Sequence, residues 1–383
     1  MDDLTKLKTA MQLITSGLYE KDRKKEKEQY FYSKHLIHGI NLFQSLNYKY
    51  NYEQFDFEQL HEQKFITDYA MKPVKEWFEG WKNTENLKLE EQEFYHMGEL
   101  VGDIGSNMFY VNDCCEDYVQ YYVEKDIIAG IEQRVVYECL RVLEQDDYVY
   151  LRKYLIQHPI IDQDEMRKLK LRYFQNNPAL DAIEKAYEEI KEDCYICPKC
   201  GWTLTQWKTK MICQSRCCTE GKYPTEKLTK IERNSGKFRL KRGVMKYICV
   251  PGKLELNILE YCQKNKIQSF LWPELDKYDI GIVFDDGEIW AVDAKQVKNP
   301  YFLRTNIRNA GGFPEGNYQK AVYVIPDAIE KTDPDYVKII KEELKRIGKN
   351  NIHCVPLRKL KSSIKYKIKK KQRKEKGGRP CSR

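Results

Sequence analysis

Apolar residues recur every three or four positions through the first half of the chain, a spacing typical of amphipathic helices. Pro159 and Pro178 interrupt this pattern and are sensible helix boundaries. We therefore expect a helical N-terminal domain at residues 1–190, for which a protein-docking surface is the default interpretation. Three apolar stripes carry the prediction: Leu4, Leu7, Met11, Ile14 and Leu18; Val135, Cys139, Val142 and Leu143; and Leu180, Ile183, Tyr187 and Ile190.

After residue 250 the pattern alternates between helical and strand periodicity. This order of elements predicts a compact α/β domain with a mixed central sheet flanked by helices, of ordinary single-domain size. The whole chain is then expected to be a multi-domain α+β protein. The expected elements are helices at Leu254–Gln263 and Asp333–Arg346, and strands at Ile280–Phe284, Ile289–Val292, Ala321–Ile325 and Ile352–Leu357.

The two strands around Asp285-Asp286-Gly287 form a predicted hairpin, and the length of its loop determines where the flanking acids point. A three-residue loop pairs Phe284 with Glu288 and places Asp279 opposite Asp293. A two-residue loop pairs Asp279 with Ala294 and sends the two carboxylates to opposite faces. We expect the three-residue loop, with Gly287 in the left-handed conformation. The alternative is an ordinary hairpin whose acids are solvated.

The residues Asp279, Asp293 and Lys295 suit metal-dependent phosphodiester cleavage. Two carboxylates can hold Mg²⁺ or Mn²⁺ through oxygen, and a nearby ammonium can stabilise the phosphate and the attacking water. Glu255 falls on the apolar face of its predicted helix, which is costly unless the carboxylate reaches a cation or a hydrogen-bond partner. We therefore count Glu255 as a fourth candidate catalytic residue.

The cysteines of residues 191–222 have the spacing of a structural zinc site. Cys197 and Cys200 form a Cys-x2-Cys knuckle, and Cys213 with Cys217 supplies a second pair. Two ambiguities stay open, because Cys194 also forms a Cys-x-x-Cys with Cys197 and because Cys218 competes with Cys217. Four thiolates would leave no open position for a substrate, so a Zn²⁺ ion here would be structural. Free or redox-active thiols are the alternative.

Positive charge is concentrated in two segments. Residues 358–383 carry a net +12, more than the +8 of the whole chain, so the remainder is acidic. Residues 201–247 add a second basic region with twelve Lys or Arg and three acids. Such patches beside a phosphodiesterase site favour salt-sensitive contact with a nucleic-acid backbone, although the C-terminal segment could instead be a disordered, solubilising tail. The candidate contacts are Lys237, Arg239, Lys241, Arg242, Lys369, Lys370 and Lys371.

The chain opens Met1-Asp2-Asp3-Leu4 without an apolar leader, and no apolar run approaches membrane length. The thirteen cysteines are either clustered as metal knuckles or scattered singly, which suits a reducing compartment. The expectation is a cytoplasmic protein that does not contact membranes.

Residues 251–357 resemble the PD-(D/E)xK restriction-endonuclease-like fold, with Asp279 as its first acid and Asp293-Ala294-Lys295 as its second motif. Roughly residues 190–330 more narrowly resemble the zinc-bearing nucleases that accompany PIWI-RE, the prokaryotic Argonaute-like proteins encoded with a helicase in presumed defence systems. This resemblance rests on Trp272-Pro273-Glu274-Leu275-Asp276-Lys277-Tyr278-Asp279 and Ala291-Val292-Asp293-Ala294-Lys295, placed behind the Cys197-Pro198-Lys199-Cys200-Gly201 knuckle. The resemblance implies that Asp279 and Asp293 bind Mg²⁺, that Lys295 polarises water or stabilises charge, and that Glu255 completes the metal shell. Asp replaces the commoner Glu in the second motif, a change that the fold tolerates.

Two interpretations from different classes follow. The first is a Mg²⁺-dependent endonuclease acting on DNA, or on an RNA–DNA hybrid, within an anti-phage or anti-plasmid defence system. The second is a catalytically silent nuclease-fold module that recruits nucleic acid, a helicase or an Argonaute-like partner. The expected organisation is a helical domain at residues 1–190, a zinc ribbon at 191–222, a basic linker at 223–250, a nuclease-like domain at 251–357 and a basic tail at 358–383.

Overall fold

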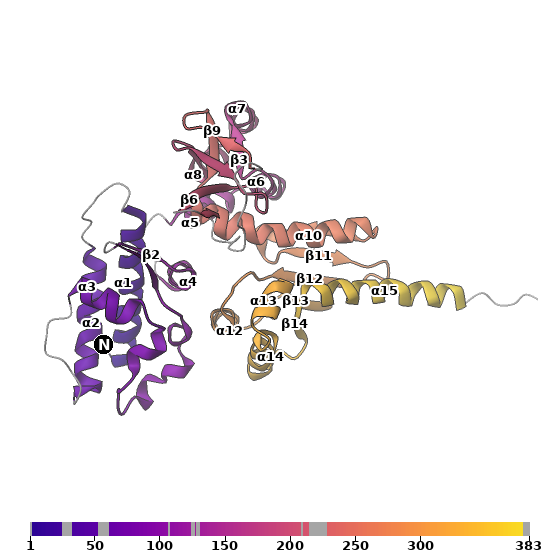
Figure 1. Ribbon diagram of the computed structural model, residues 1–383. Helices are drawn as coiled ribbons and strands as arrows, with labels where there is room; N and C mark the ends of the chain where they lie inside the picture. The colour runs from indigo at the N-terminus through magenta and orange to yellow at the C-terminus, as the bar shows by residue number, and fades with distance from the viewer. Residues whose placement is uncertain are drawn as a thin grey trace, which may run out of the picture. The chain divides into compact units, whose positions relative to one another are not determined.

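The computed structural model describes residues 2–24, 33–52, 61–105, 108–123, 127, 131–207, 210–213 and 228–377. The chain separates into two compact units, Met1–Ile131 and Glu132–Arg383, which run from indigo to magenta and from magenta to yellow (Figure 1). The division falls after Ile131 rather than near residue 190, because the helices of residues 132–186 pack against elements that follow residue 237. No helix in the described ranges has the length and apolarity needed to span a bilayer.

The first unit is built on the antiparallel packing of α1 (Asp3–Lys24) and α2 (Lys34–Tyr50). Two glycines let these helices approach closely: a Cβ at Gly17 would lie 2.4 Å from the backbone nitrogen of Leu36, and one at Gly39 would lie 2.7 Å from that of Ile14. Helix α4 (Asp113–Tyr122) packs on α1, and a short hairpin pairs β1 (Val101–Gly105) with β2 (Met108–Val111).

The rest of the first unit consists of short helical segments around an aromatic core. Phe43 of α2 lies at its centre, with ring centroids 5.3 Å from Tyr69 and 5.6 Å from Trp77. The segments are α3 (Glu62–Phe65), η2 (Ile66–Ala70), η3 (Val74–Phe78), η4 (Glu85–Leu87), η5 (Leu89–Glu91) and η6 (Phe94–His96).

The second unit begins with four helices, α5 (Glu132–Leu140), α6 (Gln145–Gln157), α7 (Gln163–Arg172) and α8 (Asn177–Ala186). Both predicted proline boundaries are confirmed: α6 ends just before Pro159, and α8 begins with Pro178 in its first turn under an Asn176 cap. The third apolar stripe is wrong at its end, since β4 (Tyr187–Glu189) replaces the helix there. The second stripe is wrong beyond Leu140, where α5 stops and Val142 is exposed.

The described residues between 191 and 249 form small antiparallel sheets and a helical turn. Strands β5 (Cys194–Ile196), β6 (Thr203–Trp207), β7 (Lys210–Cys213) and β8 (Lys230–Ile231) make one sheet in the order β7-β6-β5-β8. The stretch expected as a basic linker contains β9 (Lys237–Leu240), α9 (Arg242–Val244) and η8 (Met245–Cys249). Strand β9 lies between β4 and β3 (Ile160–Asp162) in a three-stranded sheet.

The C-terminal part of this unit contains the predicted mixed sheet, in the order β10-β11-β12-β13-β14. The first three strands are antiparallel, and β12, β13 and β14 are parallel. Strand β13 is buried along almost its whole length, as expected for a strand covered on both faces. The strands are β10 (Gln268–Leu271), β11 (Ile280–Val283), β12 (Ile289–Ala294), β13 (Lys320–Ile325) and β14 (Ile352–Pro356).

Helices cover the mixed sheet. Helix α10 contacts β10, β11 and β12, whereas α12 packs on α14 and α14 on β14 (Figure 1). The basic C-terminal segment forms the helix α15, which anchors on the domain through buried Leu360 and Ile364. The helices are α10 (Val250–Lys264), α12 (Pro300–Asn309), α13 (Asp327–Thr332), α14 (Tyr336–Arg346) and α15 (Leu357–Gly377). The short element α11 (Pro273–Asp276) is a turn whose residues Glu274 and Leu275 have left-handed backbone angles.

Candidate functional site

The hairpin between β11 and β12 has the three-residue loop that the sequence predicts. Ile280 pairs with Val292 and Val283 with Ile289, and the nitrogen of Phe284 donates to the carbonyl of Glu288 at 2.9 Å. Gly287 has φ +82°, the left-handed conformation expected for the last loop position. Continuing this register by one residue places Asp279 directly opposite Asp293.

Asp279 and Asp293 are both buried, each with 8% of its surface exposed. The backbone nitrogen of Ala294 donates to Oδ2 of Asp279 at 2.5 Å, so the first acid is fixed to the strand that carries the second. Lys295 Nζ lies 2.8 Å from Oδ1 of Asp293. The backbone nitrogen of Lys295 donates to the carbonyl of Val324, which holds the end of β12 against β13. The two acids and the lysine therefore lie together at one end of the hairpin.

The pKa values of Asp279 and Lys295 are shifted because several carboxylates lie close together in a buried site. Burial, followed by the negative charges of Glu255, Asp293 and Asp276, raises the pKa of Asp279 well above its ordinary value. Burial alone would lower the pKa of Lys295, but the carboxylates of Asp293 and Asp279 outweigh it and raise that pKa. Asp279 thus favours its protonated form more than an ordinary aspartate does, while Lys295 favours its charged form.

Glu255 of α10 is 2% exposed, and its carboxylate has the partners that its apolar position requires. Nη2 of Arg152 contacts both carboxylate oxygens at 3.2 Å, and the indole nitrogen of Trp272 donates to Oε2. The cation that Glu255 meets is therefore a guanidinium. Burial raises the pKa of Glu255, an effect that Arg152 opposes.

Arg152 also contacts a second acid that the sequence pattern did not single out. Its Nη1 lies 2.5 Å from Oδ1 of Asp276, and its guanidinium carbon lies 4.4 Å from the centre of the Trp272 ring. Burial would lower the pKa of Arg152, but Asp276 and Glu255 raise it well above its ordinary value. The group formed by Glu255, Asp276, Asp279 and Asp293 with Arg152 and Lys295 is called the acid cluster below.

The acid cluster contains four carboxylates and two cationic side chains, which leaves a formal charge of −2 when every acid is ionised. Among the described residues, however, no three of its carboxylates bring ligand oxygens within 4.8 Å of one another. Asp279 and Asp293 face each other across the hairpin, whereas Asp276 and Glu255 are paired with Arg152. The cross-strand pair is therefore the part of the cluster that is not paired with Arg152.

The only metal-ligand group of three that the described residues form consists of Cys197, Cys200 and Cys213, whose sulfurs all lie within 4.8 Å. The Sγ atoms of Cys200 and Cys213 are 3.5 Å apart. Gly201, with φ +74°, lets the backbone turn around the sulfurs, and the nitrogen of Cys197 donates to the carbonyl of Trp202. The expected fourth ligand, Cys217 or Cys218, lies outside the described residues.

Cys194 does not belong to this thiol group. It packs against Ile190 and Ile231 in a small apolar cluster, and burial raises the pKa of its thiol to about 11. The ambiguity between Cys194 and Cys200 is therefore resolved in favour of the Cys197–Cys200 knuckle.

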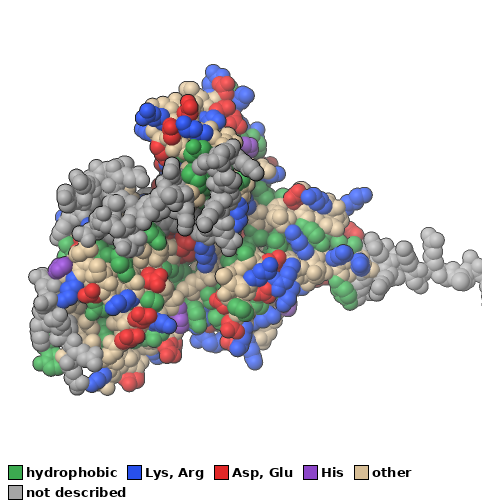
Figure 2. Space-filling model, viewed as in Figure 1, with side chains coloured by type: hydrophobic (Ala, Val, Ile, Leu, Met, Phe, Trp, Pro, Cys, Tyr) green, Lys and Arg blue, Asp and Glu red, His purple; other side chains and the backbone are tan. Residues whose placement is uncertain are grey.

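The candidate nucleic-acid contacts fall on two elements. Lys237 and Arg239 are in β9, where Arg239 is held by Glu188 at 2.8 Å and Glu192 at 2.6 Å. Lys241 immediately precedes α9, which begins at Arg242. Lys369, Lys370 and Lys371 lie in α15, but only the first has a described side chain, which is exposed. Lys and Arg side chains are frequent on the face of the second unit drawn in Figure 2.

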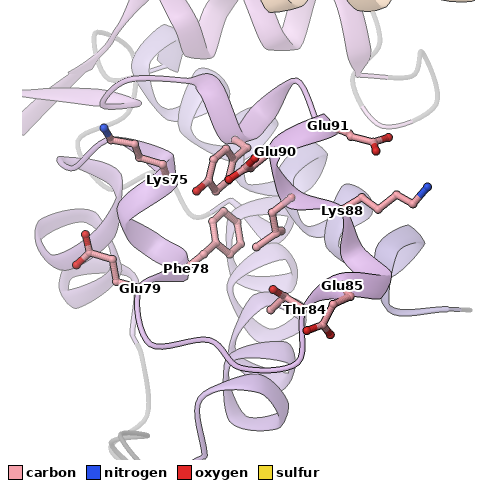
Figure 3. A pocket seen from close by; sticks show the side chains of 10 residues that line it. Lys75, Phe78, Glu79, Thr84, Glu85, Lys88, Glu90 and Glu91 are labelled. Carbon is pink, nitrogen blue, oxygen red and sulfur yellow. The ribbon is translucent and has the colours of Figure 1, made fainter.

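The first unit contains an open pocket of about 540 Å³ that no sequence pattern predicts. Phe78 and Tyr95 form its apolar floor, with ring centroids 5.9 Å apart. In Figure 3 the charged groups of Glu79, Lys88 and Glu91 point away from the cavity. These three charged groups therefore do not converge on a common point in the pocket.

Comparison with known proteins bears on the C-terminal part of the chain. Residues 252–372 match the family model described as a REase associating with pPIWI_RE. No curated protein and no solved structure matches the chain. The matched range extends from α10 through most of α15, and so contains the mixed sheet, Asp279, Asp293, Lys295 and Glu255. Residues 252–372 thus form a restriction-endonuclease-like module, similar to those that associate with pPIWI_RE.

Proposed function

We propose that the chain is a metal-dependent endonuclease that hydrolyses phosphodiester bonds of DNA. The observation that carries the proposal is the cross-strand pair Asp279 and Asp293 with Lys295, inside a restriction-endonuclease-like module. The pair offers hard oxygen ligands of the kind that Mg²⁺ and Mn²⁺ prefer. Asp279 and Asp293 lie opposite each other on neighbouring strands, so the donor set fits a hard divalent cation.

In this proposal Asp279 and Asp293 hold the cation, and Lys295 acts on the substrate. A bound divalent cation would supply Lewis-acid polarisation of the phosphate and a lowered pKa for its water. The Lys295 side chain is 34% exposed while it remains paired with Asp293, so its ammonium can reach a phosphate oxygen from solvent. Because Asp276 and Glu255 are paired with Arg152, they would set the charge around the cation without contributing ligands.

The partners and setting are proposals as well. The family description names association with pPIWI_RE, and a restriction-endonuclease-like module in such a system would serve as the nuclease of an anti-phage or anti-plasmid defence. An Argonaute-like protein, with a helicase, is then the expected partner. DNA is the expected substrate, with an RNA–DNA hybrid as an alternative that an Argonaute-like partner could present.

The test of this function is cleavage of supercoiled plasmid and single-stranded DNA with Mg²⁺ or Mn²⁺, with EDTA as the metal-free control. The variant Lys295→Met is expected to lower the rate by about 10²-fold, because one positioned charge contacting the transition state has that magnitude. Lys298→Met is the matched control, since Lys298 is an exposed lysine that follows Lys295 closely in the same module. Equal rates for all three proteins would remove the site assignment. An absence of cutting, even with partners added, would favour a silent recruiting module.

We also propose that Cys197, Cys200 and Cys213 bind one structural Zn²⁺ with Cys217 or Cys218. Metal analysis of the purified chain is expected to give one zinc per chain. Cys200→Ser should release it and destabilise the surrounding sheet, because such a site contributes folding energy directly. Cys194→Ser is the control that leaves zinc content unchanged, since Cys194 lies in the apolar cluster. Full zinc content in Cys200→Ser, or none in the wild type, would contradict the site.

Helix α15 is proposed to contact the DNA backbone through its exposed lysines. Arg358 pairs with Asp327 and Glu330, and Lys367 pairs with Asp286 and Glu288. Lys359, Lys365 and Lys369 are exposed on the same helix. Replacing these three by Gln should weaken DNA binding and reduce the salt-dependence slope by about 3, because each lysine that neutralises a phosphate adds roughly one to the slope. Titrations at several salt concentrations measure the slope, and an unchanged slope would show that α15 does not bind the backbone.

A further inference from the structure

Helix α6 lies outside the matched range of residues 252–372, yet it holds the loop that leads to Asp279. Gln145, at the start of α6, makes two hydrogen bonds to the backbone of this loop. Its Nε2 donates to the carbonyl of Trp272 at 2.9 Å, and its Oε1 accepts from the nitrogen of Leu275 at 3.0 Å. A single glutamine side chain thus bridges two points of the loop.

The loop needs such support because its backbone is in a disfavoured conformation. Trp272, Glu274, Leu275 and Asp276 have φ of 45°, 51°, 54° and 80°, in the left-handed region that residues other than glycine rarely adopt. Conformations of this kind persist only where the surrounding structure imposes them. Without the contacts from α6, the loop would be expected to relax toward ordinary backbone angles.

Arg152, seven residues further along α6, holds the side chains of the same loop. Its side chain is 3% exposed and bridges Glu255 of α10 and Asp276 of the loop. The guanidinium also lies over the ring of Trp272. Arg152 therefore joins three segments of the chain: α6, α10 and the loop.

This loop is one of the contacts that fix Asp279, beside the bond from the backbone nitrogen of Ala294 to its carboxylate. The backbone nitrogen of Trp272 donates to the carbonyl of Asp279 at 2.8 Å, so the loop closes on the residue that follows it. Asp293, by contrast, is fixed independently, because its strand pairs with β13 through Tyr323. Of the two acids, Asp279 is thus the one bonded directly to the loop that α6 holds.

We propose that Gln145 and Arg152 are positioning residues of the metal site, which keep Asp279 opposite Asp293 by holding the loop Trp272–Asp276. The metal part of this inference rests on the proposed nuclease function. The loop part does not, since it concerns the backbone in the absence of any ion. Helix α6 is then an integral part of the catalytic module, although the family match begins about a hundred residues later.

The experiment compares Gln145→Ala, Arg152→Lys and the wild-type full chain in two measurements. Amide hydrogen exchange of peptides covering residues 272–279 reports how firmly the loop is held. Mn²⁺ binding, followed by the loss of the free-ion paramagnetic resonance signal, reports the metal site without requiring cleavage. Both variants should exchange at least tenfold faster in this segment and bind Mn²⁺ at least fivefold more weakly. Arg152→Lys keeps the charge, but a single ammonium cannot span Glu255 and Asp276.

Tyr187→Phe is the control for general destabilisation. It removes a partly buried hydrogen bond of 2.7 Å to the carbonyl of His158 in the same unit, and should change neither measurement. Exchange within twofold of wild type in both variants would overturn the loop inference. Faster exchange with unchanged Mn²⁺ affinity would overturn the positioning role. If the wild type and Asp279→Asn bind Mn²⁺ equally well, or neither binds it, the proposed nuclease function is overturned. In that case the hydrogen-exchange rates of residues 272–279 still decide whether α6 holds the loop.

Discussion

Asp293→Asn is expected to abolish Mn²⁺ binding and to lower the rate of DNA cleavage by about 10³-fold or more. The reason is that Asp293, in β12, is one of the two proposed metal ligands and also forms the ion pair with Lys295. Lewis-acid stabilisation by a metal ion amounts to several kcal/mol, which corresponds to about that factor in rate. Initial rates on supercoiled plasmid and Mn²⁺ titration measure the two effects separately.

The matched control for this substitution is Asp335→Asn, an exposed acid at the start of α14 in the same module. It should cut and bind Mn²⁺ as the wild type does. Cleavage by Asp293→Asn at the wild-type rate would place the reaction elsewhere. Loss of cleavage with full Mn²⁺ binding would instead show that Asp293 acts on the lysine and that the ion is held by other residues.

The part of this site that could be predicted from sequence is the part fixed by local geometry. The spacing from Asp279 to Asp293, with Gly287 available for a left-handed position, determines the hairpin register, because side chains alternate along a strand. The mixed sheet was likewise predictable from apolar runs such as Ala321–Ile325. Strand β10 and helix α12 were missed, the former because its four residues are partly exposed and carry little apolar periodicity.

The part that could not be predicted depends on contacts between distant segments. An acid on the apolar face of α10 indicates that some partner exists, but nothing near Glu255 in the sequence identifies Arg152, which is 103 residues away. The left-handed loop at Trp272–Asp276 contains no glycine, the usual signal for such a backbone. A basic residue within the apolar stripe of α6, at Arg152, was the available signal for the ion pair.

The first predicted helical stripe, from Leu4 to Leu18, is confirmed in α1, whereas the third fails at its end for a related reason. Tyr187 continues the spacing of α8, but its backbone pairs with Leu240 in β9, and the strand replaces another helical turn. Spacing alone does not distinguish these outcomes, because a sheet partner from a later segment overrides local preference. The same strand, β9, also explains why the basic stretch from Lys237 is an ordered element.

Arg152→Met is expected to lower the free energy of unfolding of the second unit by about 3–5 kcal/mol, the cost of leaving buried acids without their cation. Arg152 and Glu255 have side chains that are 3% and 2% exposed, so solvent does not screen their interaction. If Arg152 is removed, the four carboxylates of the acid cluster are left with Lys295 as their single cation in the cluster. Urea unfolding measures the loss through the shift of the midpoint at constant slope.

The double variant Arg152→Met with Glu255→Gln separates charge from packing. A neutral amide at position 255 keeps the oxygen that accepts from the indole of Trp272 and removes one of the stranded charges. The double variant should therefore be more stable than Arg152→Met alone, although Glu255→Gln by itself is expected to be destabilising. Glu255→Gln would then lower the free energy of unfolding in the wild type but raise it in Arg152→Met, which indicates that the two residues interact directly. If the two losses simply add, Arg152 stabilises the unit through its contact with Trp272, and the acid cluster does not depend on its charge.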